Sequence, residues 1–131
     1  QHRTKPPSRY FNYIYVRMGA HTLIHKRTED DIWKNLFELP LVETEKDLSE
    51  EEFLACPQFH ALFAEGEVRM VRTLLRGVKH VLSHRVIYTN FYEVTLPDNS
   101  SSFSSYQRVA VEDLGRYAVP RLIHAFLEKY V

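Results

Sequence analysis

The stretch 78-VKHVLSHRVIYTNFYEV-94 decides the fold, because it reads as two β-rich runs that meet at a tight break. After the break, Ile87 and Phe91 fall on one parity and Tyr88 and Tyr92 on the other,. This alternation predicts a strand with two partly buried faces. The run before the break is also rich in β-branched and apolar residues, which predicts a hairpin or two tightly joined neighbouring strands.

The break itself consists of Ser83, His84 and Arg85, and it lacks the Asn-Gly or Asp-Gly pair that two-residue hairpins prefer,. Loop residues that the backbone does not require are often retained for what their side chains contact. We therefore expect function at this turn. The plain alternative is a serine-stabilised turn with an exposed histidine.

The totals predict a single soluble domain. The chain has 131 residues and is 44% hydrophobic, which is enough for one sizeable core,. The sequence contains neither a long apolar run nor a signal peptide, so we expect a cytoplasmic protein that contacts no membrane. The single cysteine, Cys56, excludes a disulfide framework and a multi-cysteine metal site within this chain, and we expect it to be a small buried side chain,.

Residues 1–9, QHRTKPPSR, have the composition of a linker,. We expect them to connect a missing N-terminal domain to a folded domain that spans residues 10–131.

Charge is segregated along the chain although the net charge is zero. Residues 1–28 and 68–92 contain basic residues and no acidic residue, whereas residues 29–67 hold twelve of the seventeen acidic residues. The second basic segment includes the turn at Ser83, so this segment is suited to a polyanion. The plain alternative is that the charge blocks are solvated faces.

The remaining elements are mixed. We expect strands at 10–18 and 22–27, and a short strand at 107–111,. Ser49 and Glu52 form a capping-box pattern that predicts a helix running toward Phe63, interrupted or restarted by Pro57. Leu122, Ile123, Phe126 and Leu127 share one face of a C-terminal helix, with Pro120 in its first turn. These elements predict an α/β (α+β) sandwich without internal repeats.

Catalytic and metal patterns are weak. His21 and His25, and also His80 and His84, are spaced by four residues, which in a strand spans about 13 Å and is too far for one ion. Ser83 and His84 resemble a nucleophile and a base, but strand neighbours point to opposite faces and no third group orients them. Glu50, Glu51 and Glu52 are explained by helix capping and the helix dipole. We expect no metal site and no catalytic residue here.

Three segments carry a resemblance. "KRTEDDIWKNLFELPLVE" resembles the segment of MutY-type adenine DNA glycosylases in which an arginine precedes a Trp-x-x-Leu-aromatic-x-hydrophobic-Pro motif. "VKHVLSHR" is similar to the damage-recognition loop of that family, and "GRYAVPRLIHAFL" is similar to its closing helix. The residues that match the first motif are Arg27, Trp33, Leu36, Phe37, Leu39 and Pro40. From the pattern alone, Trp33, Phe37 and Leu39 are expected in the core.

The resemblance implies the C-terminal, Nudix-like domain of such a glycosylase, with a mixed β-sheet flanked by helices. A Nudix hydrolase needs a Gly-x5-Glu-x7-Arg-Glu-x2-Glu-Glu box that presents carboxylates to magnesium. After Pro40 the chain reads "LVETEKDLSEEEFLACPQF", with no Arg-Glu pair and no glycine at the expected places. We expect no hydrolytic site. The glycosylase active site and its iron–sulfur cluster are expected in the missing domain, so this chain needs no cofactor of its own and is not expected to excise adenine.

The resemblance also assigns roles. In 8-oxoguanine, N7 becomes a hydrogen-bond donor and C8 carries a carbonyl, whereas guanine offers only an N7 acceptor there. Ser83, with backbone N–H groups and His84, is expected to recognise this edge, and Leu82 stands where the family often has phenylalanine and is a smaller apolar wedge. The residues expected to hold DNA phosphates are Arg85, Lys79, His80 and Arg76.

The sequence therefore predicts the lesion-recognition domain of an adenine DNA glycosylase in base excision repair, in the bacterial cytoplasm and associated with the nucleoid. Its expected partners are double-stranded DNA with 8-oxoguanine·adenine mispairs and its own N-terminal catalytic domain. One alternative is a Nudix pyrophosphohydrolase acting on an oxidised nucleoside triphosphate. Another is a protein-interaction module that uses the acidic block or the loop 98-DNSSSFSS-105,.

Overall fold

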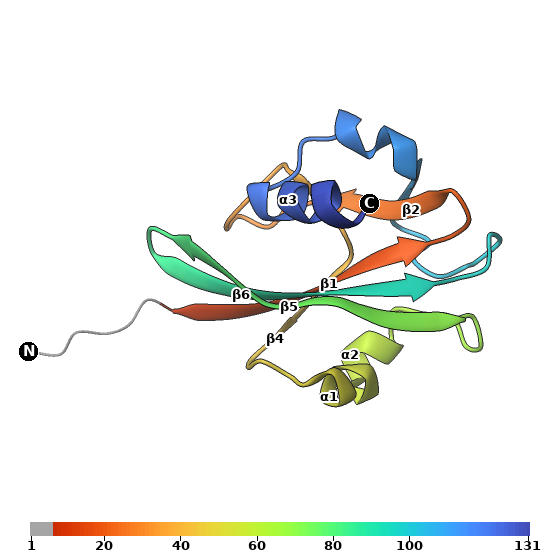
Figure 1. The fold of residues 1–131 in the computed structure, drawn as a ribbon, viewed down its shortest axis with the longest axis horizontal. Coiled ribbons are helices and arrows are strands. Elements are labelled where there is room, and N and C mark those ends of the chain that lie inside the picture. The colour runs from red at the N-terminus through yellow and green to blue at the C-terminus, as the bar shows by residue number, and fades with distance from the viewer. Residues whose placement is uncertain (1–6) are drawn as a thin grey trace, which may run out of the picture.

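The computed structural model describes residues 7–131 as two sheets with helices on both sides (Figure 1). The strands are β1 (Ser8–Arg17), β2 (His21–Lys26), β3 (Phe37–Glu38), β4 (Leu41–Thr44), β5 (Met70–Leu82), β6 (Arg85–Thr95) and β7 (Gln107–Ala110). The helices are α1 (Glu50–Ala55), α2 (Pro57–His60), the 3₁₀ helix η1 (Val111–Arg116) and α3 (Arg121–Tyr130).

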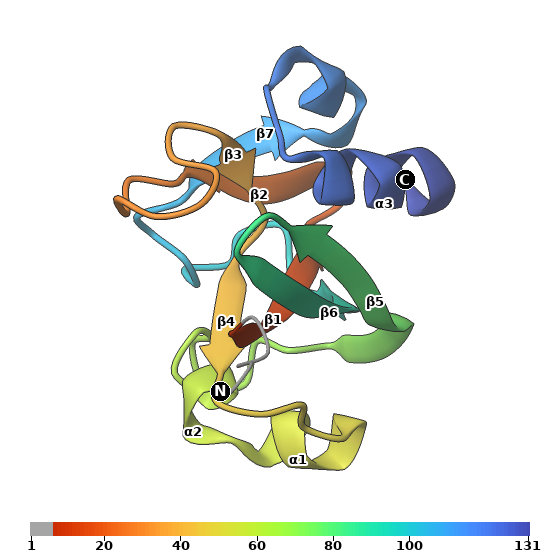
Figure 2. The same cartoon turned by 90° about the vertical axis from the view of Figure 1, so that its left-hand side faces the viewer.

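The central sheet is mixed. Its strand order is β4-β1-β6-β5, with β1 parallel to β6 and both outer pairs antiparallel. A second sheet has the order β3-β2-β7. The helices α1 and α2 lie on one side of the central sheet, and α3 lies with the second sheet on the other (Figures 1 and 2). This arrangement confirms the predicted α+β sandwich.

The central sheet is buried on both faces. Ile87 and Phe91 of β6 belong to a core shared with α3, in which Phe91 stacks on Phe126 at 4.2 Å between ring centroids. Tyr92 belongs to the opposite core and stacks on Phe53 of α1 at 4.6 Å. The alternation predicted for β6 is therefore confirmed.

Local signals placed the helices correctly. The Ser49 hydroxyl accepts a hydrogen bond from the Glu52 amide at 3.1 Å, and the Glu52 carboxylate accepts one from the Ser49 amide at 2.9 Å. This is the predicted capping box. The helix ends at Ala55, and Pro57 starts α2, which ends at His60 rather than at Phe63.

The C-terminal helix is also confirmed. Pro120 stands at the N-cap of α3, one position before the first turn in which it was expected. Leu122, Ile123 and Phe126 are buried and Leu127 is half-buried. No helix in the described part of the chain, residues 7–131, is long and apolar enough to cross a membrane.

The first strand begins earlier than expected. Ser8 and Arg9, which were assigned to the linker, belong to β1, and Arg9 is fixed by two hydrogen bonds of 2.7 Å to the Glu43 carboxylate on β4. This cross-strand ion pair was not foreseen because Glu43 is distant in sequence. Residues 1–6 of the predicted linker lie outside the described residues.

The opening stretch forms the expected hairpin. Leu82 of β5 pairs with Arg85 of β6, so Ser83 and His84 make a two-residue turn. The pairing register of β5 shifts on both sides of Leu75, before the hairpin end resumes at Val78. The end of the hairpin curls away from α1 and α2, toward the side that carries the β2–β3 loop (Figures 1 and 2).

Candidate nucleic-acid interface

The Ser83–His84 turn forms the tip of the hairpin. Both residues are exposed, and neither is among the residues of the described chain with positive φ. The turn is therefore not of the I′ or II′ type that two-residue hairpins favour. Within residues 7–131, no hydrogen bond to the side chain of Ser83 or His84 is found, so both side chains are open to a ligand.

The hairpin end has two faces. Residues directly opposite each other in an antiparallel pair point to the same face. Leu82 pairs with Arg85, and His80 pairs with Ile87 on the face of the α3 core, against which Leu82 packs. Lys79 pairs with Tyr88 on the other face.

The predicted phosphate-binding residues are therefore divided. His80 and Arg85, both half-buried, lie on the face of Leu82, whereas the exposed Lys79 lies on the opposite face. Tyr88 stacks there on Tyr10 of β1 at 5.7 Å between ring centroids. Lys79 is thus placed opposite Tyr88, on the face away from His80.

Arg76 does not reach the turn. Its Nη1 donates to the Tyr92 hydroxyl at 2.7 Å, its Nη2 donates to the Leu48 carbonyl at 2.9 Å, and it forms an ion pair with Asp47 at 3.5 Å. These partners lie on the side of α1. The register shifts in β5 separate Arg76 from the hairpin end, and its contact with a DNA phosphate stays a prediction.

An aromatic contact ties the hairpin end to the rest of the domain. Trp33 lies in the β2–β3 loop. The centroid of its ring lies 5.9 Å from that of His80 and 6.0 Å from that of Phe11 on β1. Trp33 packs half-buried against the core, as Phe37 does, and Leu39 is fully buried, so all three residues serve the core as expected. The contact with His80 was missed, because nothing local in the sequence links these two positions.

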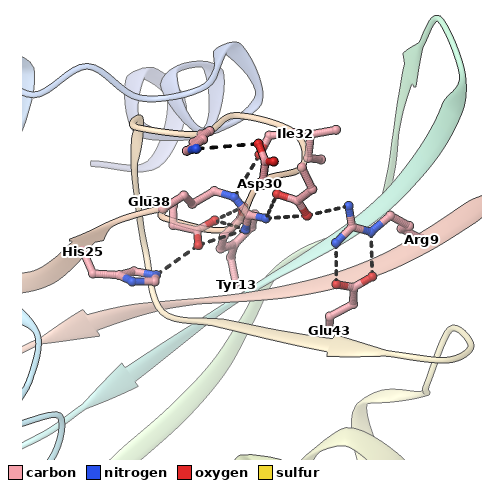
Figure 3. A network of polar contacts seen from close by, with 10 residues as sticks. Arg9, Tyr13, His25, Asp30, Ile32, Glu38 and Glu43 are labelled. Carbon is pink, nitrogen blue, oxygen red and sulfur yellow. Dashed lines mark hydrogen bonds and ion pairs between the residues drawn. The ribbon is translucent and has the colours of Figure 1, made fainter.

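A buried ionic network supports the β2–β3 loop (Figure 3). The Arg27 side chain is almost fully buried, and its Nη1 donates to both Glu38 oxygens at 3.1 Å. Its Nη2 donates to both Asp31 oxygens at 2.9 and 3.0 Å, and its Nε donates to the Ile32 carbonyl at 3.1 Å. Asp31 also accepts a hydrogen bond from Arg9 at 3.0 Å.

The network is electrostatically matched. Burial opposes ionisation of Asp31, but hydrogen bonds from Arg27 and Arg9 outweigh it and lower the pKa of that carboxyl,. Burial and the nearby Glu38 carboxylate raise the pKa of Tyr13 well above its usual value, and the Tyr13 hydroxyl donates to Glu38 at 2.6 Å. His25 Nε2 stands 3.0 Å from Glu38 but without the alignment of a hydrogen bond. The charged groups of the network are bonded to one another, so the network supports the structure and is not a ligand-binding site.

The serine-rich loop is anchored by one carboxylate. Glu67 accepts hydrogen bonds from the hydroxyls of Ser100 and Ser102, the latter at 2.7 Å, and from the Ser101 amide at 3.1 Å. Hydrogen bonds from Ser100 and Ser102 lower the pKa of Glu67 to about 2. The loop at residues 98–105 is therefore held to the β5 side of the domain.

The alternative metal and cofactor patterns have no geometric support within the described residues. No cluster of three or more His, Cys, Asp or Glu side chains in residues 7–131 is arranged to hold a metal ion. Glu52 is used by the capping box, and Glu50 accepts a hydrogen bond from Thr73. An iron–sulfur cluster needs several thiolates, so the single, half-buried Cys56 does not fit one,.

A concave region lies at the opposite end of β1. Arg17 lines a cavity of about 540 Å³ together with Tyr15 and His21. Arg17 also donates to the buried Glu93 carboxylate at 3.2 Å, and Arg72 donates to the other oxygen of the same carboxylate at 2.8 Å. This cavity was not predicted and lies away from the turn.

The fold is shared with solved structures of two kinds. The C-terminal domain of mouse MUTYH, from its complex with human PCNA, has a TM-score of 0.69 at 15% identity and covers 93% of this chain and 86% of its own. The MutT protein from Methanosarcina mazei Go1 has a TM-score of 0.60 at 18% identity and covers 97% and 95%. MutT from a study of Aliivibrio salmonicida and Vibrio cholerae has a TM-score of 0.61 at 15% identity and covers 93% and 95%. At these identities the likeness shows the fold alone.

Sequence comparison gives the family. No curated protein shows significant sequence similarity to the chain. The sequence profile of the NUDIX domain matches residues 12–129, which is nearly the whole chain. The chain therefore belongs to the NUDIX domain family.

Proposed function

We propose that this domain recognises 8-oxoguanine opposite adenine for an adenine DNA glycosylase, and that the Ser83–His84 turn contacts the oxidised base. The observation that carries the proposal is the position of this turn at the exposed end of a long hairpin. No other described residue forms a hydrogen bond with the side chains of the turn. The three sequence motifs and the fold shared with the MUTYH domain support it.

The hairpin suits the groove in which the lesion differs from guanine. The major groove admits a two-stranded β-ribbon and exposes the N7 edge of the purine. Leu82 and Arg85 on one face and Lys79 on the other give the hairpin end a cation on each side. Such cations fit a ribbon that lies between two phosphate backbones, where phosphate contacts fix position and base contacts give selectivity.

The Ser83 hydroxyl determines how strongly the domain can prefer 8-oxoguanine over guanine. The Ser83 hydroxyl can accept a hydrogen bond from the N7–H of 8-oxoguanine, while a backbone N–H donates to the C8 carbonyl. The hydroxyl can also rotate and donate to N7 of guanine, so its selectivity requires that the complex with DNA hold the hydroxyl with a lone pair toward N7. One hydrogen bond of about 0.5–1.5 kcal/mol then gives a preference of about 2- to 12-fold.

The test is a titration of the chain, and of the glycosylase that carries it, against duplexes with 8-oxoguanine·adenine or guanine·adenine at one stated salt concentration. We expect Ser83→Ala to lower the ratio of the two affinities by about 2- to 10-fold. Ser104→Ala, at an exposed serine of the loop at residues 98–105, is the matched control. An affinity ratio that Ser83→Ala leaves unchanged contradicts the proposal.

Nucleotide hydrolysis is the second candidate, because the chain belongs to the NUDIX family and has a cavity lined by Arg17. The chain lacks the carboxylate box that positions magnesium in Nudix hydrolases,. The test is pyrophosphate release from 8-oxo-dGTP by the chain with magnesium. Release that Arg17→Ala abolishes and Ser83→Ala preserves would favour this candidate over lesion recognition.

A protein-docking role is the third candidate. The similar MUTYH domain was solved in a complex with PCNA, and in this chain the residues from Glu50 to Glu52 form an exposed acidic patch. A pulldown of a protein partner that survives replacement of residues 81–85 would favour this candidate. If the domain recognises the lesion, we propose that the protein binds DNA in the cytoplasm. Its own catalytic domain would then be its partner.

A further inference from the structure

We infer that Trp33 is a positioning residue that sets the orientation of the Ser83–His84 turn through His80. This inference rests on the proposed function, because it names a residue that determines the selectivity of the same site. It is carried by the backbone of Trp33, by the bonds that fix the β2–β3 loop, and by the place where the indole ring packs.

The backbone of Trp33 is strained. Its φ is +60°, in the left-handed region that large side chains rarely adopt,. Asn35 in the same loop has φ +71°, which is a common conformation for asparagine and not for tryptophan,. Such strain persists only where the surroundings over-determine the conformation, and it clusters at functional sites.

The surroundings of Trp33 are fixed by Arg27. The Arg27 amide donates to the Leu36 carbonyl at 2.9 Å, and the Asn35 amide donates to the Arg27 carbonyl at 2.8 Å. The buried Arg27 guanidinium holds the carbonyl of Ile32, the residue before Trp33. The Leu36 amide closes the turn on the Trp33 carbonyl at 3.0 Å. The loop is thus a rigid support that is attached to the core.

The strained backbone directs the ring toward the hairpin. The indole lies between Phe11, on the central sheet, and His80, three residues before Ser83. On the far side of His80 from the turn, Gly77 has φ +69° and the register of β5 shifts, so the hairpin end is offset from the sheet below it. Val78 and Leu82 also pack on the core, and His80 is the residue of the hairpin end whose ring pairs with the Trp33 ring.

The first test needs no DNA. Amide signals of Ser83 and His84 are recorded by two-dimensional NMR in Trp33→Ala, Trp33→Phe and the control Phe37→Ala. Phe37 is a half-buried aromatic residue whose ring lies 5.0 Å from the Tyr117 ring between centroids. We expect the Ser83 and His84 signals to move in Trp33→Ala and to stay in place in Phe37→Ala. Equal shifts in both variants, or none in Trp33→Ala, would overturn the inference.

The second test measures selectivity. We expect Trp33→Ala and Trp33→Gly to lower the 8-oxoguanine preference by the same factor, about 2- to 10-fold, as Ser83→Ala does. We expect Trp33→Phe to retain most of the preference, because it keeps a ring against His80. A double variant of Trp33→Ala and Ser83→Ala should be no less selective than Ser83→Ala alone. Additive losses would show that Trp33 acts independently of the turn.

The two proposals fail in different ways. If the unaltered protein shows no preference for 8-oxoguanine, the proposed function fails while the NMR test of Trp33 still stands. If the preference exists but Trp33→Ala leaves both it and the Ser83 signal unchanged, only the positioning role fails. His80→Ala, which removes a half-buried ring from the surface, provides a folded variant that should reproduce the effect of Trp33→Ala.

Discussion

Two polar regions of this domain differ in how their groups are satisfied. Around Arg27, the charged groups are buried and bonded to one another, so the region holds the β2–β3 loop in place. At Ser83 and His84, the polar groups are exposed and unbonded to any described residue. The difference shows that a matched polar cluster fixes structure, whereas an unmatched one is available for recognition. Trp33 lies between the two regions.

The most damaging change should be in the network. Arg27→Met leaves the Glu38 carboxylate buried without its main partner, and we expect the free energy of unfolding to fall by about 3–5 kcal/mol. Urea denaturation measures this loss. Arg116→Met breaks the exposed ion pair with Asp113, which lies outside the network, and should cost about 1 kcal/mol or less,. Equal losses in the two variants would remove the distinction between a buried network and a surface pair.

Substitutions at the strained residue Trp33 should change the free energy of unfolding by a smaller amount, and the direction of the change depends on the residue introduced. Trp33→Gly and Trp33→Ala remove the same ring, but glycine adopts φ +60° without strain, so we expect Trp33→Gly to be more stable than Trp33→Ala by about 1 kcal/mol,. The neighbouring Lys34 is not among the described residues with positive φ, and there alanine should be the more stable choice. Equilibrium unfolding of the four variants decides the sign at each position.

At the turn, affinity should change without selectivity. Arg85→Ala should weaken binding to lesion and normal duplexes alike and reduce the slope of log K against log salt by about 0.9, the value for one phosphate contact. Arg108→Ala is the control, because Arg108 lies on β7 of the second sheet and donates to the Asp98 carbonyl. A loss confined to the lesion duplex would place Arg85 at the base instead of the backbone.

The smallest effect at neutral pH should come from Glu67, which anchors the loop at residues 98–105. Its pKa in the folded protein is about 2, against an ordinary value of 4.5. The stabilisation is therefore complete above about pH 4.5 and is lost as the pH falls toward 2,. Glu67→Gln should remove this part of the acid dependence in thermal unfolding, whereas Glu65→Gln, at an exposed residue nearby, should not. An unchanged acid profile in Glu67→Gln would show that the anchor adds no stability.

The sequence predicted those features that depend on near neighbours. The capping box at Ser49, the restart at Pro57 and the two faces of β6 follow from spacing within a few residues, and each is confirmed. The turn at Ser83 was also placed correctly, because its two flanking strands are contiguous in sequence.

Long-range features were missed for physical reasons. Counting parity along β5 fails, because the register shifts around Leu75 and the Gly77 amide is bonded to the Asn90 side chain. The Arg76 side chain therefore donates to the Leu48 carbonyl just before α1, a contact that spacing within β5 does not indicate. The contact of Trp33 with His80 depends on a backbone conformation that tryptophan does not favour, so no propensity could indicate it.

The parallel pairing of β1 with β6 has a consequence for how the protein is made. Ser8 lies beside Val86, and the two strands stay paired up to Arg17 and Thr95, about 78 residues apart along the chain. On the ribosome, the apolar strand 10-YFNYIYV-16 therefore emerges long before β6, and until then only β4 can pair with it,. Nascent chains that stop before Arg85 lack β6, so we expect the edge of β1 that pairs with β6 to stay exposed to chaperones during synthesis.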